Sequence, residues 1–249
     1  MWKKLIFTEN FKILSKDIGK DNLIINRGIL EIFENLGLHH ADLAGHGAND
    51  IKKIGLSWIV LDWKVKVLKR PKYGQNLTAK TWGRVMDERR KKLFTYREFE
   101  IFDEEGNLCV IATSKWVMMD INTWKLAKLG DEILEKYGPE DKYLFDSPEL
   151  ERIKVPTEFS NEITYKVSRK DIDYNGHVHN LYYLDLAYEA LPEDVFNNRP
   201  YDNFRINYKK EIKYGDLIKC KYSFVDGKHF VTICGAEDEK KINAIVELF

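Results

Sequence analysis

The sequence predicts an α+β fold made of two similar halves, each with a mostly antiparallel sheet wrapped on a central helix. Three observations support this prediction. A weak internal repeat relates the halves, each half has one segment whose apolar residues recur at helical spacing, and strand-like runs with turn signals follow each of those segments. Each half therefore reads as a strand, then a helix, then several strands.

The repeat appears when the chain is compared with itself. Residues 11–19, FKILSKDIG, resemble 165–173, YKVSRKDID, and residues 62–74, DWKVKVLKRPKYG, resemble 203–215, NFRINYKKEIKYG. The first pair is offset by 154 residues (165 minus 11) and the second by 141 (203 minus 62). The first half therefore holds 13 more residues between its motifs, and we place them at 43–55.

One helix is predicted in each half. The apolar residues of segment 27–45 keep helical spacing until Gly45, which makes a plausible stop. Those of segment 181–191 do the same until Pro192, which cannot continue a helix. Both helices are expected to be largely buried.

Strand-like runs follow each helix. They are 93–102 and 109–119 in the first half, and 219–225 and 228–235 in the second, where an Asp-Gly pair joins them. Asp-Gly between such runs is a strong hairpin signal, so we expect mostly antiparallel sheets.

Segment 121–158 mixes a short helical piece with glycine, proline and acidic residues, and it reads as a linker. It would join an N-terminal half (1–120) to a C-terminal half (159–249).

The composition excludes several classes of protein. Lysine plus arginine (40) balance aspartate plus glutamate (40), so the total charge indicates neither nucleic acid nor a bulk anionic membrane as a partner. No apolar run reaches the ~18 residues of a membrane span, and the amino end lacks a signal peptide. The three cysteines form no CxxC pair, which argues against a disulfide framework or structural zinc. We expect a cytoplasmic protein.

Candidate catalytic residues gather in DIDYNGHVHN at 171–180, where Asp173, Asn175 and His177 alternate. An extended segment would send all three side chains to one face. The repeat aligns these positions and Glu211 with non-matching residues of the first half, which are Gly19, Asp21, Leu23 and Arg70. Only the second half keeps the polar set, and this asymmetry favours a function over a purely structural role.

Each candidate also has an interpretation without a function. Asp173 and Asn175 are typical turn and cap residues, whose side chains bond their own backbone. His177 has alternatives as a core histidine or as a metal ligand with His179, although no third ligand is near. Glu211 lies among lysines, where a solvated charge is common. We expect neither a metal nor another cofactor.

The segment 171–192, followed by YKKEI at 208–212, resembles the carboxy-terminal half of the acyl-acyl carrier protein (acyl-ACP) thioesterases of plants and bacteria. In that family an Asp-x-Asn-x-His run precedes a helix, and a glutamate lies on a later strand. TSKWVMMD at 113–120 and FENLGLHHADLAG at 33–45 resemble the family's first half. The resemblance thus spans most of the chain.

The resemblance implies a double hotdog fold, with two sheets each wrapped round a long helix. It also implies hydrolysis of fatty acyl-ACP, which releases free fatty acid and terminates chain elongation. The matching catalytic positions are Asp173, Asn175, His177 and Glu211. Plant members commonly carry a cysteine directly after this glutamate, whereas this chain has Ile212, which excludes a papain-like covalent mechanism at that position.

A mechanism can be outlined without a cysteine. A thiol leaving group has a pKa near ~8.5 and needs little general-acid help, so activating water is the harder task. We expect Glu211, with a pKa raised by burial, and His177 to deprotonate the water. Asp173 would orient them and Asn175 would donate a hydrogen bond. Backbone N–H groups at the start of the following helix would hold the oxyanion.

The acyl tail needs an apolar slot, and the first half, which lacks the polar set, is the expected host. Its chain-length determinants are expected among Ile32, Phe33 and Leu36. ACP is acidic, so basic patches are candidate docking sites. The default interpretation of such a patch is a solvent-exposed face without a binding role. The basic residues concerned are Arg89, Arg90, Lys91, Lys92, Lys209 and Lys210.

Other functions fit the same residues. The protein could be an acyl-CoA thioesterase, which hydrolyses a thioester of coenzyme A instead of ACP. It could be a hotdog dehydratase, which eliminates water from an acyl thioester, or a non-catalytic module that binds the acyl carrier without hydrolysis. Paired acid and imidazole in one half argue against the binding module. The sequence leaves open whether the protein forms a homodimer, because the two halves of one chain can already pair with each other.

Overall fold

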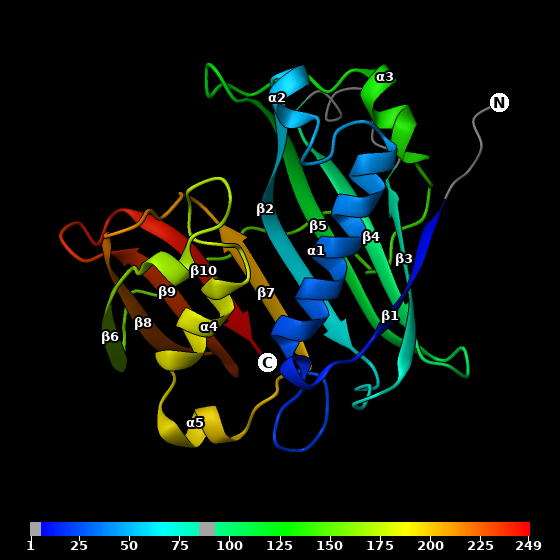
Figure 1. Cartoon of the computed structure of the whole chain (residues 1–249). Coiled ribbons are helices and arrows are strands. Elements are labelled where there is room, and N and C mark those ends of the chain that lie inside the picture. Colours follow the sequence, from blue (N-terminus) through cyan, green and yellow to red (C-terminus); the bar gives the residue numbers. More distant parts are fainter. Residues whose placement is uncertain (1–5, 85–92) are drawn as a thin grey trace. The chain divides into compact units, whose positions relative to one another are not determined.

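The computed structural model describes residues 6–84 and 93–249 of the chain (Figure 1). By the packing of its backbone the chain divides into two compact units, 1–150 and 151–249. We refer to them as unit 1 and unit 2 and describe each separately.

Unit 1 is an antiparallel sheet with one long helix, α1 (Asn26–Leu43), lying along it (Figure 1). Among the described residues the strands are ordered β1-β3-β4-β5-β2. Short helical pieces lie near both ends of α1 and in the segment after β5. The strands are β1 (Phe7–Lys12), β2 (Leu56–Val67), β3 (Asn76–Gly83), β4 (Thr95–Phe102) and β5 (Leu108–Asp120), and the short pieces are η1 (Ser15–Asp17), α2 (Ile51–Ile54), α3 (Asp131–Leu134) and η2 (Glu135–Tyr137).

Helix α1 confirms the helix predicted in the first half. Its apolar stripe is buried against the sheet, where the ring of Phe33 lies 4.9 Å from that of Phe99 and 6.0 Å from that of Trp63. The helix stops just before Gly45, which adopts a φ of +76° that disfavours other residues. Burial of this stripe supplies most of the force that holds α1 in place.

The predicted linker lies largely within unit 1. Leu129, Ile133 and Tyr137 are buried in one cluster with residues from the end of α1. Further along, the backbone carbonyl of Lys142 accepts a hydrogen bond from Trp82 Nε1 at 3.0 Å. The division suggested by the packing, after residue 150, falls inside the predicted linker 121–158, whose bounds stay a prediction. The many glycines and acidic residues of this segment favoured a linker prediction, although a few apolar side chains anchor the segment to unit 1.

Unit 2 has the same topology on a smaller scale. Its described strands are ordered β6-β8-β9-β10-β7, antiparallel throughout, which matches β1-β3-β4-β5-β2 position by position. Its main helix α4 packs on β9 and β10 but has 8 residues, against 18 in α1. The elements are β6 (Asn161–Lys166), η3 (Arg169–Asp171), α4 (Tyr182–Glu189), α5 (Glu193–Asn197), β7 (Asn203–Tyr208), β8 (Leu217–Val225), β9 (Lys228–Gly235) and β10 (Ile242–Leu248).

The local signals of unit 2 also match the predictions. Asp226 and Gly227 join β8 to β9 with φ values of 51° and 77°, the left-handed conformations that a tight hairpin requires. The predicted α+β class, with antiparallel strand pairing and one principal helix per half, is therefore confirmed. In the described parts of the chain, we find no helix with the length and apolar character needed to cross a membrane.

The internal repeat holds at the level of single residues. The backbone bridge between Ile18 and Ile24 recurs between Ile172 and Val178, which is the offset of 154 residues predicted from the sequence (172 minus 18). A duplicated architecture explains both the shared strand order and these matching bridges. Unit 1 therefore serves as an internal reference for the polar residues found only in unit 2.

Candidate active site

The segment that carries Asp173, Asn175 and His177 is a tight turn, so the predicted extended conformation is wrong. The backbone N–H of Asp173 donates to the carbonyl of His177 at 2.8 Å, and that of Gly176 donates to the carbonyl of Asp173 at 3.1 Å. Gly176 has a φ of +83°, which few residues other than glycine adopt easily. The Asn-Gly pair within this run was the signal for a turn, and it outweighs the alternation of polar residues.

Asp173 organises this turn through its side chain. Its Oδ1 accepts hydrogen bonds from the backbone N–H of Asn175 at 2.8 Å and from that of His177 at 3.2 Å. Its Oδ2 accepts a long bond of 3.5 Å from the side-chain amide of Asn175. The interpretation of Asp173 as a residue that bonds its own local backbone is therefore correct, and it also places the other two candidates.

His177 and Glu211 meet as the resemblance implied. His177 Nε2 lies 3.0 Å from Glu211 Oε2, and the two side chains are 22% and 46% exposed. The chain around Glu211 pairs with the turn, since the backbone N–H of Val178 donates to the carbonyl of Ile212 at 2.8 Å. The side chain of Ile212 is fully buried, so its neighbour Glu211 faces the opposite way.

Glu211 is not buried as expected. Its carboxylate is 46% exposed and its second oxygen, Oε1, lies 2.9 Å from Lys213 Nζ. Sequence reasoning did not select Lys213. The only signal for it was the spacing of two residues, which places Glu211 and Lys213 on the same face of an extended segment.

Tyr183, on the first turn of α4, is a second residue that the sequence analysis missed. Burial raises the pKa of Tyr183, and the nearby carboxylates of Glu211 and Asp173 raise it further. Its ring packs edge-on against Tyr208 at 5.1 Å. The phenol therefore stays neutral, and its hydroxyl is hydrogen-bonded to the backbone of Ile212 beside Glu211.

The backbone amides expected to hold an oxyanion are largely engaged already. The N–H of Val178 bonds to Ile212, that of His179 to the carbonyl of Asp171, and that of Tyr182 to the carbonyl of His179. The N–H of Leu181 bonds to His179 Nδ1 at 3.3 Å. The expected role of these amides is therefore wrong for most of them, because α4 begins several residues beyond His177 and a hydrogen-bonded turn fills the gap.

In unit 1 the corresponding positions hold no acid and imidazole. The bridge between His177 and Lys213 recurs between Leu23 and Lys72. Where unit 2 has Glu211, unit 1 has Arg70, whose guanidinium donates to the carbonyl of Ile24 at 2.8 Å. The same backbone therefore exists twice, and only one copy carries an imidazole paired with a carboxylate.

None of the cysteines is placed as a nucleophile. Cys109, Cys220 and Cys234 are all buried and unpaired with one another. Burial raises the pKa of each thiol, to about 12 for Cys220. A thiol with such a pKa is protonated at neutral pH, so it is neither a nucleophile nor a metal ligand there. Nor do the described residues bring together three or more side chains suited to binding a metal ion.

The remaining predicted residues are placed as follows. Ile32, Phe33 and Leu36 are buried on α1 in unit 1, and their contact with a substrate stays a prediction. Lys209 and Lys210 are exposed just before Glu211, and their role in docking also stays a prediction. The basic run at 89–92 lies outside the residues that the structure describes.

Comparison with solved structures identifies the fold. A crystal structure of an acyl-ACP thioesterase from Bacteroides thetaiotaomicron superposes with a TM-score of 0.85 and 21% identity, covering 98% of this chain and 97% of that one. The 12:0-ACP thioesterase from Umbellularia californica superposes with a TM-score of 0.84 and 20% identity, covering 98% and 96%. At these identities the likeness establishes a shared fold.

Curated relatives give lower coverage of their own length. Oleoyl-acyl carrier protein thioesterase 1, chloroplastic, of Arabidopsis thaliana is 24% identical over 231 residues, 86% of this chain and 62% of that protein. Palmitoyl-acyl carrier protein thioesterase, chloroplastic, of Cuphea hookeriana is 27% identical over 224 residues, 83% of this chain and 52% of that protein. The chain thus spans between about half and three fifths of the length of these relatives.

Two family models cover most of the sequence. The N-terminal domain of the acyl-ACP thioesterases matches residues 4–137, and the C-terminal domain of the same family matches residues 154–245. The second match contains the turn, His177 and Glu211. The chain belongs to the acyl-ACP thioesterase family.

Proposed function

We propose that the protein hydrolyses fatty acyl-ACP thioesters, releasing free fatty acid and ACP and so ending chain elongation. The observation that carries this proposal is the contact of 3.0 Å between His177 and Glu211, beside the turn that holds Asn175. An imidazole paired with a carboxylate can take a proton from water, which is the step that thioester hydrolysis requires. Membership of the family supports the choice of acyl-ACP as substrate.

In this mechanism the water molecule is deprotonated by the His177–Glu211 pair as its oxygen attacks the carbonyl carbon. The tetrahedral intermediate then collapses, the C–S bond breaks, and the thiolate takes the proton back. A thiolate is a good leaving group, so the second step needs little assistance. The ionised Glu211 stabilises the imidazolium that forms in between.

Asn175 is the side chain best suited to polarise the carbonyl. It is exposed on the turn, and its amide carries two N–H donors, of which Asp173 accepts one through a long bond. The second donor is suited to the oxygen on which negative charge develops. Asp173 then acts as a positioning residue, because its carboxylate holds the backbone of both Asn175 and His177.

Each unit fits the description of one hotdog, a sheet packed round a central helix, and we assign them different roles. Unit 1 would host the acyl tail between α1 and its sheet, where Ile32, Phe33 and Leu36 lie. Its apolar interface supports this role, since a fatty acyl chain is stabilised there by the hydrophobic effect. Unit 2 would supply the chemistry.

Recognition of ACP is assigned to the exposed Lys209 and Lys210, which precede Glu211 and would meet an acidic carrier next to the site. A cytoplasmic location is supported by the three buried free cysteines, which suit a reducing compartment.

The test is thiol release from acyl-ACPs of several chain lengths, measured beside the matching acyl-CoAs. We expect wild type to release thiol and to prefer acyl-ACP. His177→Ala and Glu211→Gln should lower kcat about a hundredfold or more, because general acid–base catalysis is worth that much. Glu189→Gln, which removes an exposed carboxylate from α4, is the control and should behave as wild type.

The alternatives give different results in the same assay. Binding of acyl-ACP without thiol release would refute hydrolysis and indicate a binding module. Water elimination from a hydroxyacyl thioester that leaves the thioester intact would indicate a dehydratase. Equal or faster turnover of acyl-CoA would indicate that coenzyme A, and not ACP, carries the acyl group of the natural substrate.

A further inference from the structure

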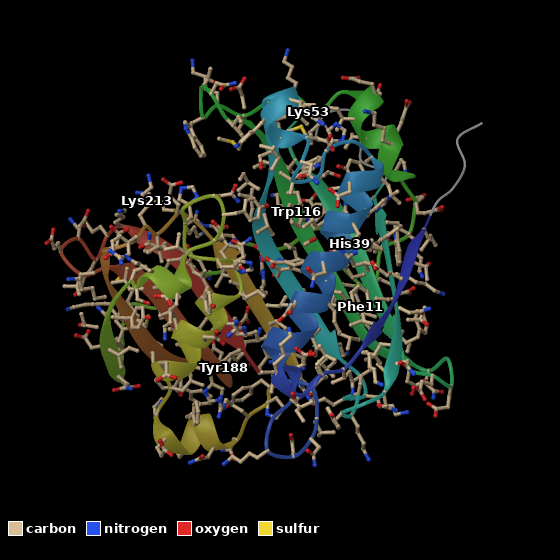
Figure 2. All side chains as sticks on the ribbon, in the orientation of Figure 1. Phe11, His39, Lys53, Trp116, Tyr188 and Lys213 are labelled. Atoms are coloured by element: carbon tan, nitrogen blue, oxygen red, sulfur yellow. The ribbon has the colours of Figure 1, made fainter. Side chains whose placement is uncertain are left out.

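We propose that Lys213 is a positioning residue of the active site, whose ammonium group holds one oxygen of Glu211 so that the other oxygen faces His177. The inference deepens the proposed function and rests on it. Lys213 lies at the outside of unit 2, where Figure 2 labels it, and its side chain is 60% exposed. Neither the sequence motif nor the implied catalytic set includes it.

The two oxygens of Glu211 have separate partners. Oε2 lies 3.0 Å from His177 Nε2, and Oε1 lies 2.9 Å from Lys213 Nζ. An exposed glutamate with one partner rotates among several rotamers, and fixing it in one of them costs conformational entropy. A second, charged partner on the other oxygen offsets that cost and keeps the carboxylate turned towards the imidazole.

The backbone that carries Lys213 is itself fixed against the catalytic turn. Lys213 forms an isolated backbone bridge with His177, and the side chain of Ile212 between Glu211 and Lys213 is fully buried. On the other side, the N–H of Lys213 donates to Asp216 Oδ2 at 2.9 Å, and its carbonyl accepts from the N–H of Asp216 at 3.2 Å. Lys213 is therefore anchored on both sides, although its side chain is exposed.

The charge of Lys213 also acts on the carboxylate of Glu211. Its ammonium lies 2.9 Å from Glu211 Oε1 and attracts the negative charge of that carboxylate. The other ionisable groups near this pair are Asp173 in the turn, Asp216 after Lys213, and the neutral phenol of Tyr183 on α4. Lys213 is the cation that counters these acids.

Unit 1 provides a matched control. Lys72 occupies the position equivalent to Lys213, with the corresponding bridge to Leu23, and it is also exposed. Its backbone N–H donates to Gln75 Oε1 at 2.7 Å, as that of Lys213 does to Asp216. Since Arg70 stands in unit 1 where unit 2 has Glu211, Lys72 has no catalytic carboxylate to hold.

The experiment compares Lys213→Met, Lys213→Arg and Lys72→Met with wild type. We expect Lys213→Met to lower kcat about tenfold with KM changed less than about twofold, both on acyl-ACP and on an N-acetylcysteamine thioester that has no carrier protein. Lys213→Arg should recover most of the loss, and Lys72→Met should match wild type. Because the ion pair is exposed, high salt should reduce the difference between Lys213→Met and wild type.

A pH profile and an NMR titration of His177 provide a second test of the role of Lys213. Removing the positive charge favours a cationic site, so in Lys213→Met the acidic limb of kcat/KM should move to higher pH. An unchanged His177 titration together with wild-type kcat would overturn the inference. A raised KM for acyl-ACP alone, with the carrier-free thioester unaffected, would also overturn it, since Lys213 would then serve docking. Failure of wild type to hydrolyse any thioester would instead refute the proposed function.

Discussion

Glu98 makes the stability of unit 1 depend on pH. It lies on β4 with its side chain 1% exposed, and burial raises the pKa of its carboxyl from the ordinary 4.5 to about 7. Hydrogen bonds from Thr113 Oγ1 at 2.8 Å and from the N–H of Leu144 at 3.3 Å, and the guanidinium of Arg84 at 3.5 Å, oppose this rise. Burial outweighs them.

The size of the effect follows from the two pKa values. Between pH 4.5 and about 7 the folded protein keeps a proton on Glu98 that the unfolded chain has lost. The free energy of unfolding therefore falls as pH rises through this window, and above it Glu98 causes no further change with pH. A gap of about 2.5 pH units, at about 1.4 kcal/mol each, corresponds to about 3.4 kcal/mol.

Glu98→Gln should remove this dependence, because glutamine has no proton to lose. The measurement is urea unfolding of wild type and variant at several pH values from 4.5 to 7.5, followed by tryptophan fluorescence. All 6 tryptophans precede residue 151, so the signal reports on unit 1. The stability of wild type relative to the variant should fall by about 3 kcal/mol across the range.

Thr113→Val provides the opposite perturbation. It removes a hydrogen bond that favours the carboxylate, so the pKa of Glu98 should rise and the loss of stability should extend to higher pH. Parallel curves of unfolding free energy against pH for wild type and Glu98→Gln would refute the reasoning.

Three further predictions follow from the packing and the turn. Phe33→Ala should destabilise unit 1 by about 3–5 kcal/mol in urea unfolding, because it empties the space against Trp63. Asp173→Ala should lower kcat for thiol release at least tenfold by freeing the turn, whereas Asp173→Asn, which keeps an acceptor oxygen, should lose less. Gly176→Ala should cost about 1 kcal/mol in thermal or urea unfolding, and Gly176→Asn should cost less, because Asn22 holds the equivalent position in unit 1 with a φ of 61°.

Much of the fold could be predicted from the sequence because its signals are local. The stripe on α1, the Asp-Gly hairpin between β8 and β9, and the two repeat offsets each depend on residues close together in the chain. The burial of Leu129, Ile133 and Tyr137 within the predicted linker could not be predicted, because these residues are few and scattered and their burial depends on contact with the end of α1.

The part of the candidate site that could be predicted also depends on local signals in the sequence. The motif selected Asp173, Asn175 and His177 but not the turn that they form, and the resemblance added Glu211. Lys213 and Tyr183 were missed, because their relation to Glu211 arises from the pairing of the turn with the segment after β7 and from the first turn of α4. Apart from the two-residue spacing of Glu211 and Lys213, no periodicity in the sequence indicates such contacts.

Strand order has a consequence for synthesis. β10 pairs with β7 on one side and β9 on the other, yet it is translated after every other strand of unit 2. Unit 1, whose last residues are near 150, can fold while the ribosome is still adding unit 2. The nascent β7 and β9 must wait with unpaired backbone edges until residues 242–248 emerge, so this half of the molecule is the one that chaperones are expected to bind.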